Sequence, residues 1–171
     1  MASPSTRALR SAAALVLALA STAAAGCGAE TGRPGEGETH LELGSGSWRF
    51  EPLEDGQAVD LVRGAQGGWH IWISVRAEGF AESQAVLELE TQVADESRPP
   101  QHTEVEVRLE RPDAEGRRAF IGWPAILAEP GCLMGEMLRV TATLRDDAGT
   151  RVEAERYVTV MGGDDPPTAC E

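Results

Sequence analysis

The chain contains no lysine and no asparagine, so its cationic side chains, apart from three histidines, are all arginines. The absence of lysine excludes Schiff-base and other lysine chemistry. The absence of asparagine excludes an N-glycosylation acceptor site. Aromatic residues make up only 5% of the chain, and there are three cysteines. The residues with distinctive chemistry are therefore few enough to consider individually.

Common catalytic motifs are absent as well. There is no Gly-x-Ser-x-Gly nucleophile elbow and no His-Glu-x-x-His zinc helix. The pairs Asp146-Asp147 and Asp164-Asp165 do not belong to a spaced Asp-x-Asp-x-Asp calcium loop, and they are typical of turns. We therefore expect a protein that is not an enzyme and that carries no cofactor.

The charge balance is strongly acidic, with a formal net charge of −13. Residues 1–26 contain Arg7 and Arg10 and no acidic residue, so the rest of the chain has 13 basic and 28 acidic residues, a net charge of −15. Nucleic acids and anionic headgroups are bound through basic surfaces. We therefore expect no nucleic-acid partner.

The first 27 residues have the features of an export signal. Arg7 and Arg10 precede an apolar run at 12–20, which small residues follow at 21–26. This run is shorter than the roughly 20 apolar residues that a membrane-spanning helix needs. The small residues end at Cys27, and the whole arrangement resembles the signal sequence of bacterial lipoproteins, although Ala24 stands where that family usually has an aliphatic residue.

The resemblance implies cleavage before Cys27, a diacylglycerol group on its sulfur and an acylated amine. Two or three acyl chains such as palmitate hold a protein stably on a membrane. Residue 28 is Gly rather than Asp, so the inner-membrane retention signal of some lipoproteins is missing, which favours the outer membrane of the bacterial cell envelope. The alternative is an ordinary secreted protein that is cut near Ala25, with Cys27 incidental.

The remaining chain divides into three parts by composition. Residues 27–46 comprise Cys27 and a Gly-rich stretch with few apolar residues, which predicts a flexible tether. Residues 47–162 predict the folded domain, and residues 163–171 an acidic tail.

The folded part shows the period of two that is typical of β-strands, and no sustained helical period occurs beyond the signal. Pro124 should interrupt a strand or lie at a sheet edge. The strand patterns lie at 47–53, 58–62, 69–75, 86–90, 105–109, 119–121, 137–144 and 151–160. A turn at 146–150 joins the last two as a hairpin.

Short strands separated by turns predict an all-β fold, an antiparallel β-sandwich of about seven strands. The layout resembles immunoglobulin-like and fibronectin-type domains, with Trp69 or Trp72 as the buried tryptophan of the third strand. The resemblance implies no active site.

The stretch Gln66-Gly67-Gly68-Trp69-His70 is the most distinctive local sequence, and it resembles an element of uncharacterised lipoproteins with a similar architecture. In the strand that follows, Trp69, Ile71, Ile73 and Val75 should face the core, since side chains alternate between the two faces. The other face carries His70, Trp72, Ser74 and Arg76. Of these, His70, Trp72 and Arg76 form a candidate ligand-binding row. Alternatively, His70 bonds a neighbouring loop and Trp72 covers the sheet.

Cys132, Met134 and Met137 place three sulfur atoms within six residues, and soft ligands of this kind select Cu(I). A second metal possibility is a zinc site built from His70 and His102 with Glu104. If Cys27 is lipidated, however, Cys132 and Cys170 are the two cysteines left in an oxidising compartment, which predicts a disulfide that holds the tail on the domain.

The function expected from these observations is that of a lipid-anchored, extracytoplasmic module. It would act by binding or by structural association with a protein or glycan partner. The alternative is a small extracytoplasmic protein that binds copper or zinc.

Overall fold

The computed structural model describes residues 39–163, 167 and 170, which lie in the compact unit Gly32–Glu171. The predicted signal at 1–26 and Cys27 are outside the described residues. Within them, nine strands and one 3₁₀ turn follow one another in this order: β1 (His40–Ser45), β2 (Glu51–Pro52), β3 (Gln57–Arg63), β4 (Trp69–Glu78), β5 (Gln84–Val93), β6 (Gln101–Arg108), β7 (Arg118–Ile126), η1 (Pro130–Cys132), β8 (Met137–Arg145) and β9 (Arg151–Gly162).

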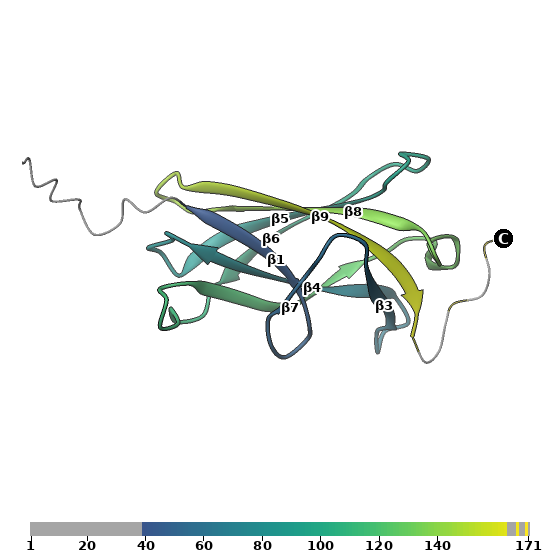
Figure 1. Ribbon diagram of the computed structural model, residues 1–171, viewed down its shortest axis with the longest axis horizontal. Helices are drawn as coiled ribbons and strands as arrows, with labels where there is room; N and C mark the ends of the chain where they lie inside the picture. The colour runs from purple at the N-terminus through teal and green to yellow at the C-terminus, as the bar shows by residue number, and fades with distance from the viewer. Residues whose placement is uncertain (1–38, 164–166, 168–169, 171) are drawn as a thin grey trace, which may run out of the picture. The chain divides into compact units, whose positions relative to one another are not determined.

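The strands form one sheet in the order β2-β1-β4-β3-β9-β8-β5-β6, and β7 pairs with β4. The sheet curls into a half-barrel, so that β4 and β7 lie opposite β5, β8 and β9 (Figure 1). The predicted all-β class is confirmed. The predicted immunoglobulin- or fibronectin-like antiparallel sandwich of about seven strands is wrong.

The strand β3 is the reason for this difference. Its last residues, Val62 and Arg63, pair with β4, whereas Gln57–Leu61 pairs with β9. One strand therefore belongs to both halves of the structure and makes the sheet continuous. The pairing of β3 with β9 is parallel, so the sheet is mixed rather than antiparallel.

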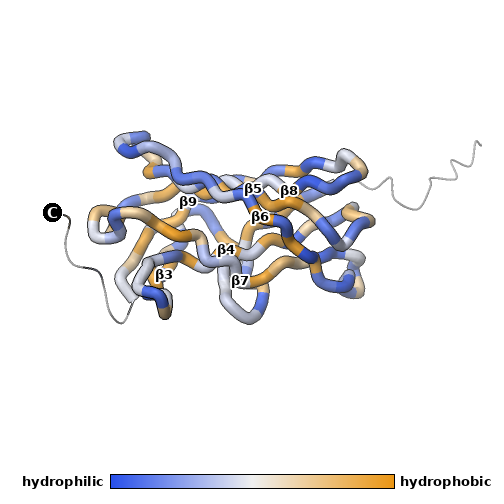
Figure 2. The backbone as a smooth tube through the Cα atoms, turned by 180° about the vertical axis from the view of Figure 1, so that it is seen from behind, coloured by the Kyte–Doolittle hydropathy of each residue, from blue (hydrophilic) through white to orange (hydrophobic). Residues whose placement is uncertain are grey.

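A single hydrophobic core fills the concave side of the sheet. Apolar residues, which supply this core, alternate along the strands with polar residues, as the hydropathy colouring of the backbone shows (Figure 2). The most completely buried large side chains are Leu43, Leu61, Ile71, Ile73, Val75, Leu87, Leu138, Val140, Leu144, Val158 and Val160. Burial of one such side chain contributes about 1.5–3 kcal/mol.

The sequence pattern missed one strand, β1, and predicted another, at 47–53, that is mostly loop. β1 lies within the stretch 27–46 that we assigned to a tether, so the sheet begins at His40 rather than at Ser47. The predicted strand at 47–53 is mostly loop, and only Glu51 and Pro52 pair with β1. The closing hairpin is as predicted: β8 pairs with β9 across the turn at 146–150, in which the Thr150 amide donates to Asp146 Oδ1 at 2.8 Å.

Apart from the two-residue strand β2, which pairs only with β1, the edges of the curled sheet are β6 and β7. Among the described strands, β6 pairs only with β5 and β7 only with β4. The edges meet at their ends, where the Glu110 amide donates to the Ala119 carbonyl at 2.7 Å and the Ala128 amide donates to Gln101 Oε1 at 2.8 Å. Pro124 lies in β7, at a sheet edge as the sequence indicated.

Candidate functional site

The strand β4 divides its side chains between the core and the outer face as predicted. Ile71, Ile73 and Val75 are fully buried in the core, and Trp69 is half-buried and packs against it. His70, Trp72, Ser74 and Arg76 occupy the opposite face. That face is not open along its whole length, because a loop crosses it.

The loop between β1 and β2 covers the middle of the outer face. The Ser74 hydroxyl donates to the Gly46 carbonyl and accepts from the Gly122 amide, both at 3.0 Å. Gly122 has a φ of +76°, and a Cβ placed on it would lie 2.7 Å from the Ser47 carbonyl oxygen. The loop therefore sits directly on a bulge of β7, where only glycine leaves room for it.

Arg76 is occupied by contacts within the molecule. Its Nε and Nη2 donate to Glu42 Oε2 at 2.9 and 2.6 Å, and its guanidinium lies 4.3 Å from the centre of the Phe50 ring. An ion pair combined with a cation–π contact fixes this side chain against the sheet. Arg76 thus positions Phe50 and Glu42 rather than presenting a free cation to a ligand.

His70 and Trp72 contact each other on the outer face. Their rings meet edge to face, with centroids 4.5 Å apart. His70 is buried, and its Nε2 has no hydrogen-bond partner. Burial lowers the pKa of His70, since the charged imidazolium loses its hydration. The imidazole is therefore neutral at physiological pH and acts as packing beside Trp72.

Apolar residues of β7 lie opposite this pair, and the loop that carries Trp48 contacts the same strand at Gly122. Pro124 is opposite Trp72 across the β4–β7 ladder, and Ile126 is opposite His70. Ile126 is 65% exposed, and Trp48, which follows the Ser47 carbonyl seated on Gly122, is 93% exposed. We call Trp48, Trp72, Pro124 and Ile126 the outer β4–β7 patch. An almost fully exposed tryptophan held by an ordered loop is typical of an interaction surface.

Of this patch, the sequence pattern indicated only Trp72 as a candidate binding residue. Trp48 was part of a predicted alternating strand, and Ile126 fell beyond one. The sequence signal that was available for a loop at Trp48 is the Gly46-Ser47 pair directly before it, which is typical of a turn rather than of a strand.

The residues of the predicted copper site are not brought together. Cys132 is bonded to Cys170 in a disulfide, with the two Cα atoms 4.4 Å apart, so it offers no thiolate. Met134 packs against the core, whereas Met137 is 43% exposed at the start of β8. The predicted disulfide is confirmed, and with it formed the Cys132 sulfur is not available as a copper ligand.

The residues of the predicted zinc site are also separated. His70 lies on β4 between Val62 and Ile126, whereas His102 lies on β6 opposite Glu90, and β4 and β6 are not neighbours in the sheet. In the described part of the chain, no three His, Cys, Asp or Glu side chains converge in a way that would hold a metal ion.

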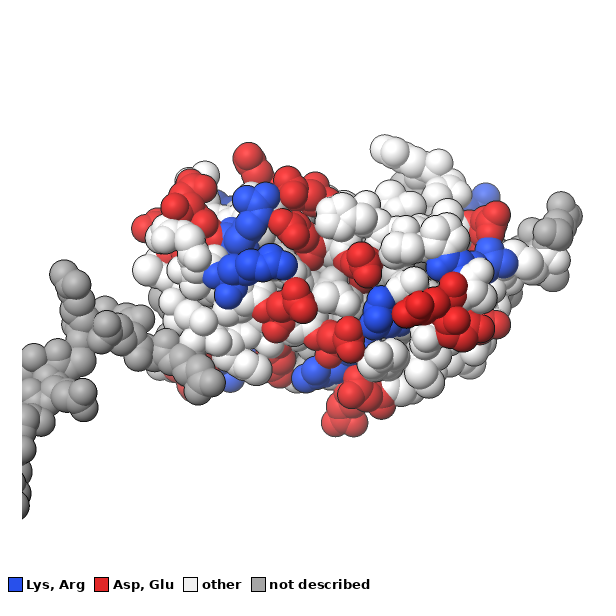
Figure 3. Space-filling view, turned by 90° about the horizontal axis from the view of Figure 1, so that it is seen from above, with Lys and Arg blue, Asp and Glu red and all other residues white. Residues whose placement is uncertain are grey.

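The outer face of β5, β6, β8 and β9 is a network of charges (Figure 3). Arg145 lies between Glu88 at 2.8 Å and Glu104 at 3.3 Å, two carboxylates that face each other across the β5–β6 ladder. The hydrogen bond from Arg145 lowers the pKa of Glu88. Like charges directly opposite each other are destabilising, and Arg145 offsets this repulsion between Glu88 and Glu104 at neutral pH.

The chain matches no family model, and no curated protein matches it. In the residues that the structure describes, no helix is long and apolar enough to cross a membrane.

Proposed function

We propose that this protein is an interaction module of the bacterial cell envelope that binds a protein or glycan partner through the outer β4–β7 patch. The exposure of Trp48 carries the proposal. The indole ring is 93% exposed, yet its loop is fastened to Ser74 and Gly122 by hydrogen bonds and close packing. Tryptophan is enriched in binding surfaces because a rigid ring offers a large contact area at a small loss of conformational entropy.

The rest of the described surface favours the same location for a binding site. The outer face of β5, β6, β8 and β9 carries glutamates and arginines that pair with each other. Such a face is well hydrated and resists association. A partner therefore gains most by covering the outer β4–β7 patch, where the exposed groups are apolar.

The proposal also includes an anchor. The lipoprotein-like signal that ends at Cys27 supports cleavage before this residue and acylation of it, with the domain held outside the cytoplasm, at the outer membrane. The disulfide between Cys132 and Cys170 supports an oxidising compartment. Intact-mass measurement of the full chain expressed in a diderm bacterium tests the anchor. We expect loss of residues 1–26 and added acyl groups, and Cys27→Ser should abolish both.

Site-specific photo-crosslinking in intact cells tests the binding surface. A photoreactive residue at Trp48 should give a discrete covalent product, and Ile126→Ser should reduce its yield. The matched control is the same residue at Glu82, an exposed loop position away from the patch. Equal products from both positions, or no effect of Ile126→Ser, would contradict binding at this surface.

A further inference from the structure

A second feature of the molecule is a cavity of about 290 Å³ that opens into the core. It lies between the loop that joins β5 to β6 and the segment that joins β7 to η1. Its wall includes Val93, Leu127, Leu133 and Leu138, each 5% exposed or less. The volume is close to the lower end of the range of small-molecule pockets, about 300 Å³. The wall is therefore suited to an aliphatic group.

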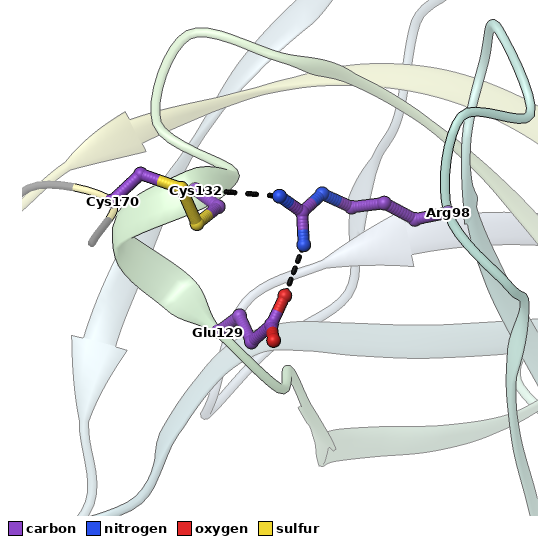
Figure 4. The surroundings of a disulfide bond; sticks show 4 residues. All are labelled: Arg98, Glu129, Cys132 and Cys170. Atoms are coloured by element: carbon purple, nitrogen blue, oxygen red, sulfur yellow. Dashed lines mark hydrogen bonds and ion pairs between the residues drawn. A yellow bond between two sulfur atoms is a disulfide. The ribbon is translucent and has the colours of Figure 1, made fainter.

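Among the residues that the structure describes, the charged side chains that line this cavity are those of Arg98 and Glu129. Arg98 reaches from the β5–β6 loop toward the segment before η1, where one of its amino groups donates to the Glu129 carboxylate (Figure 4). Its other amino group lies 3.9 Å from the sulfur of Cys170, which is a weak acceptor. The N–H groups that face the sulfur can therefore donate to an acceptor stronger than sulfur, such as a carboxylate oxygen.

The backbone conformation of Glu129 is unusual. Its φ is 49° and its ψ is 52°, in the left-handed region that residues other than glycine rarely adopt. The turn that follows holds it there, because the Cys132 amide donates to the Glu129 carbonyl at 2.9 Å and Cys132 is tied to Cys170. Strained residues of this kind concentrate at binding sites.

The ion pair between Arg98 and Glu129 is replaceable. The Glu129 side chain is 67% exposed and that of Arg98 is 35% exposed. Exposed pairs of this kind add little to stability. A carboxylate that arrives from the cavity side can therefore take the place of Glu129, since the planar guanidinium fork matches a carboxylate in two parallel hydrogen bonds.

We propose that this cavity binds a small molecule with an aliphatic body and one terminal carboxylate. The aliphatic body lies against Leu127, Leu133 and Leu138, and the carboxylate binds Arg98 in place of Glu129. Because the Arg98 side chain is less exposed than that of Glu129, a carboxylate is preferred over an amine of the same length.

Calorimetric titration of the full chain, with its disulfide formed, tests this proposal. The probes are octanoate, octan-1-ol and octylamine, which share the same aliphatic body and differ in the head group. We expect octanoate to bind one to one and about tenfold more tightly than octan-1-ol. The carboxylate forms a charge-assisted hydrogen bond with Arg98, and the neutral hydroxyl does not. Octylamine should bind more weakly than octanoate.

Three variants locate the site. Arg98→Met should remove the preference for octanoate over octan-1-ol, whereas Arg49→Met, at an exposed ion pair in the β1–β2 loop, should not. Glu129→Gln should tighten octanoate binding by removing the competing carboxylate, and Glu51→Gln is its control. Ala128→Trp should block all binding, since this exposed residue lines the cavity and a large ring there fills it without entering the core.

Either of two results would overturn the proposal. One is the absence of saturable octanoate binding by a folded chain. The other is octanoate binding that Ala128→Trp and Arg98→Met leave unchanged, which would place the ligand elsewhere on the molecule.

Discussion

At the scale of single residues, burial and partners decide which of the distinctive side chains are free to bind. Arg76 is held by Glu42 and Phe50, and Ser74 by Gly46 and Gly122. Trp48 has little contact with the rest of the domain and remains available. The fold therefore uses Arg76 and Ser74 for internal contacts and leaves Trp48 exposed for binding.

The exposure of Trp48 predicts a small effect on stability. Trp48→Ala should change the free energy of unfolding in urea by no more than about 0.5 kcal/mol, as for other surface substitutions. Ile73→Ala, at a fully buried position of β4, should cost about 2–5 kcal/mol. A large loss of stability in Trp48→Ala would show that the indole packs on the domain rather than facing solvent.

The buried imidazole of His70 predicts a pH dependence of stability. Burial lowers the pKa of His70 in the folded state below its ordinary value of 6.5, so the unfolded chain binds more protons as the pH falls. The free energy of unfolding should therefore decrease as the pH drops below about 6.5, with a slope of at most about 1.4 kcal/mol per pH unit. It should be independent of His70 above that pH.

Urea denaturation between pH 7 and pH 5 checks this expectation, in a range above the ordinary pKa values of aspartate and glutamate. His70→Gln should flatten the decrease, whereas His102→Gln, at an exposed position of β6, should leave it in place. If the decrease in stability disappeared in His102→Gln and persisted in His70→Gln, the titrating group would be His102, which would contradict this prediction.

At the scale of elements, the sequence pattern predicted the strands better than their ends. The alternation in β5 matches its burial, with Ala85, Leu87, Leu89 and Val93 inward. The prediction at 47–53 was wrong because Trp48 and Phe50 alternate with polar residues as in a strand, whereas the loop is fixed by contacts with Ser74 and Gly122, which are distant in the sequence. Long-range contacts of this kind override local propensity.

The bulge in β7 gives a sharp test of the loop contact. Gly122→Ala should destabilise the protein, because φ is +76° and the new Cβ would lie 2.7 Å from the Ser47 oxygen. Gly116→Ala is the matched control, since its φ is +81° but nothing lies within 4 Å of the new Cβ. In both variants the alanine must adopt a positive φ, which costs about 1 kcal/mol of backbone strain. The loss of stability in urea should be larger for Gly122→Ala, and equal losses would contradict the close contact.

Pro124 protects the free edge of β7. The amide of Leu127 donates to the Trp69 carbonyl, so the alternation of the antiparallel ladder turns the backbone of Pro124 away from β4. Proline there removes a donor from the edge, whose residues Ala119–Ile126 carry no charge. Pro124→Val should therefore increase self-association in sedimentation velocity. Pro112→Val, in an exposed loop, is the control, and equal masses for both variants would contradict an edge-protecting role.

At the scale of the whole molecule, the disulfide connects Cys170, which follows β9 in the sequence, to the end of the domain that contains η1 and Arg98. A cross-link between residues 38 apart stabilises by about 4 kcal/mol in the chain-entropy model. The double variant Cys132→Ser/Cys170→Ser should lose about this amount in urea denaturation. It should match the reduced wild-type chain, and a difference between the two would show that the serines themselves disturb the fold.

The sequence alone determined the all-β class, the two faces of β4, the closing hairpin and the pairing of Cys132 with Cys170. These follow from local periodicity, from turn residues and from the small number of cysteines. The tertiary structure decided that β3 pairs with both β4 and β9, so that one curled sheet replaces the expected sandwich. It also decided that Trp48 and Ile126 are exposed and that Arg98 meets Glu129. The physical reason is that a period of two fixes which side of a strand is apolar, whereas strand partners are set by contacts between distant residues.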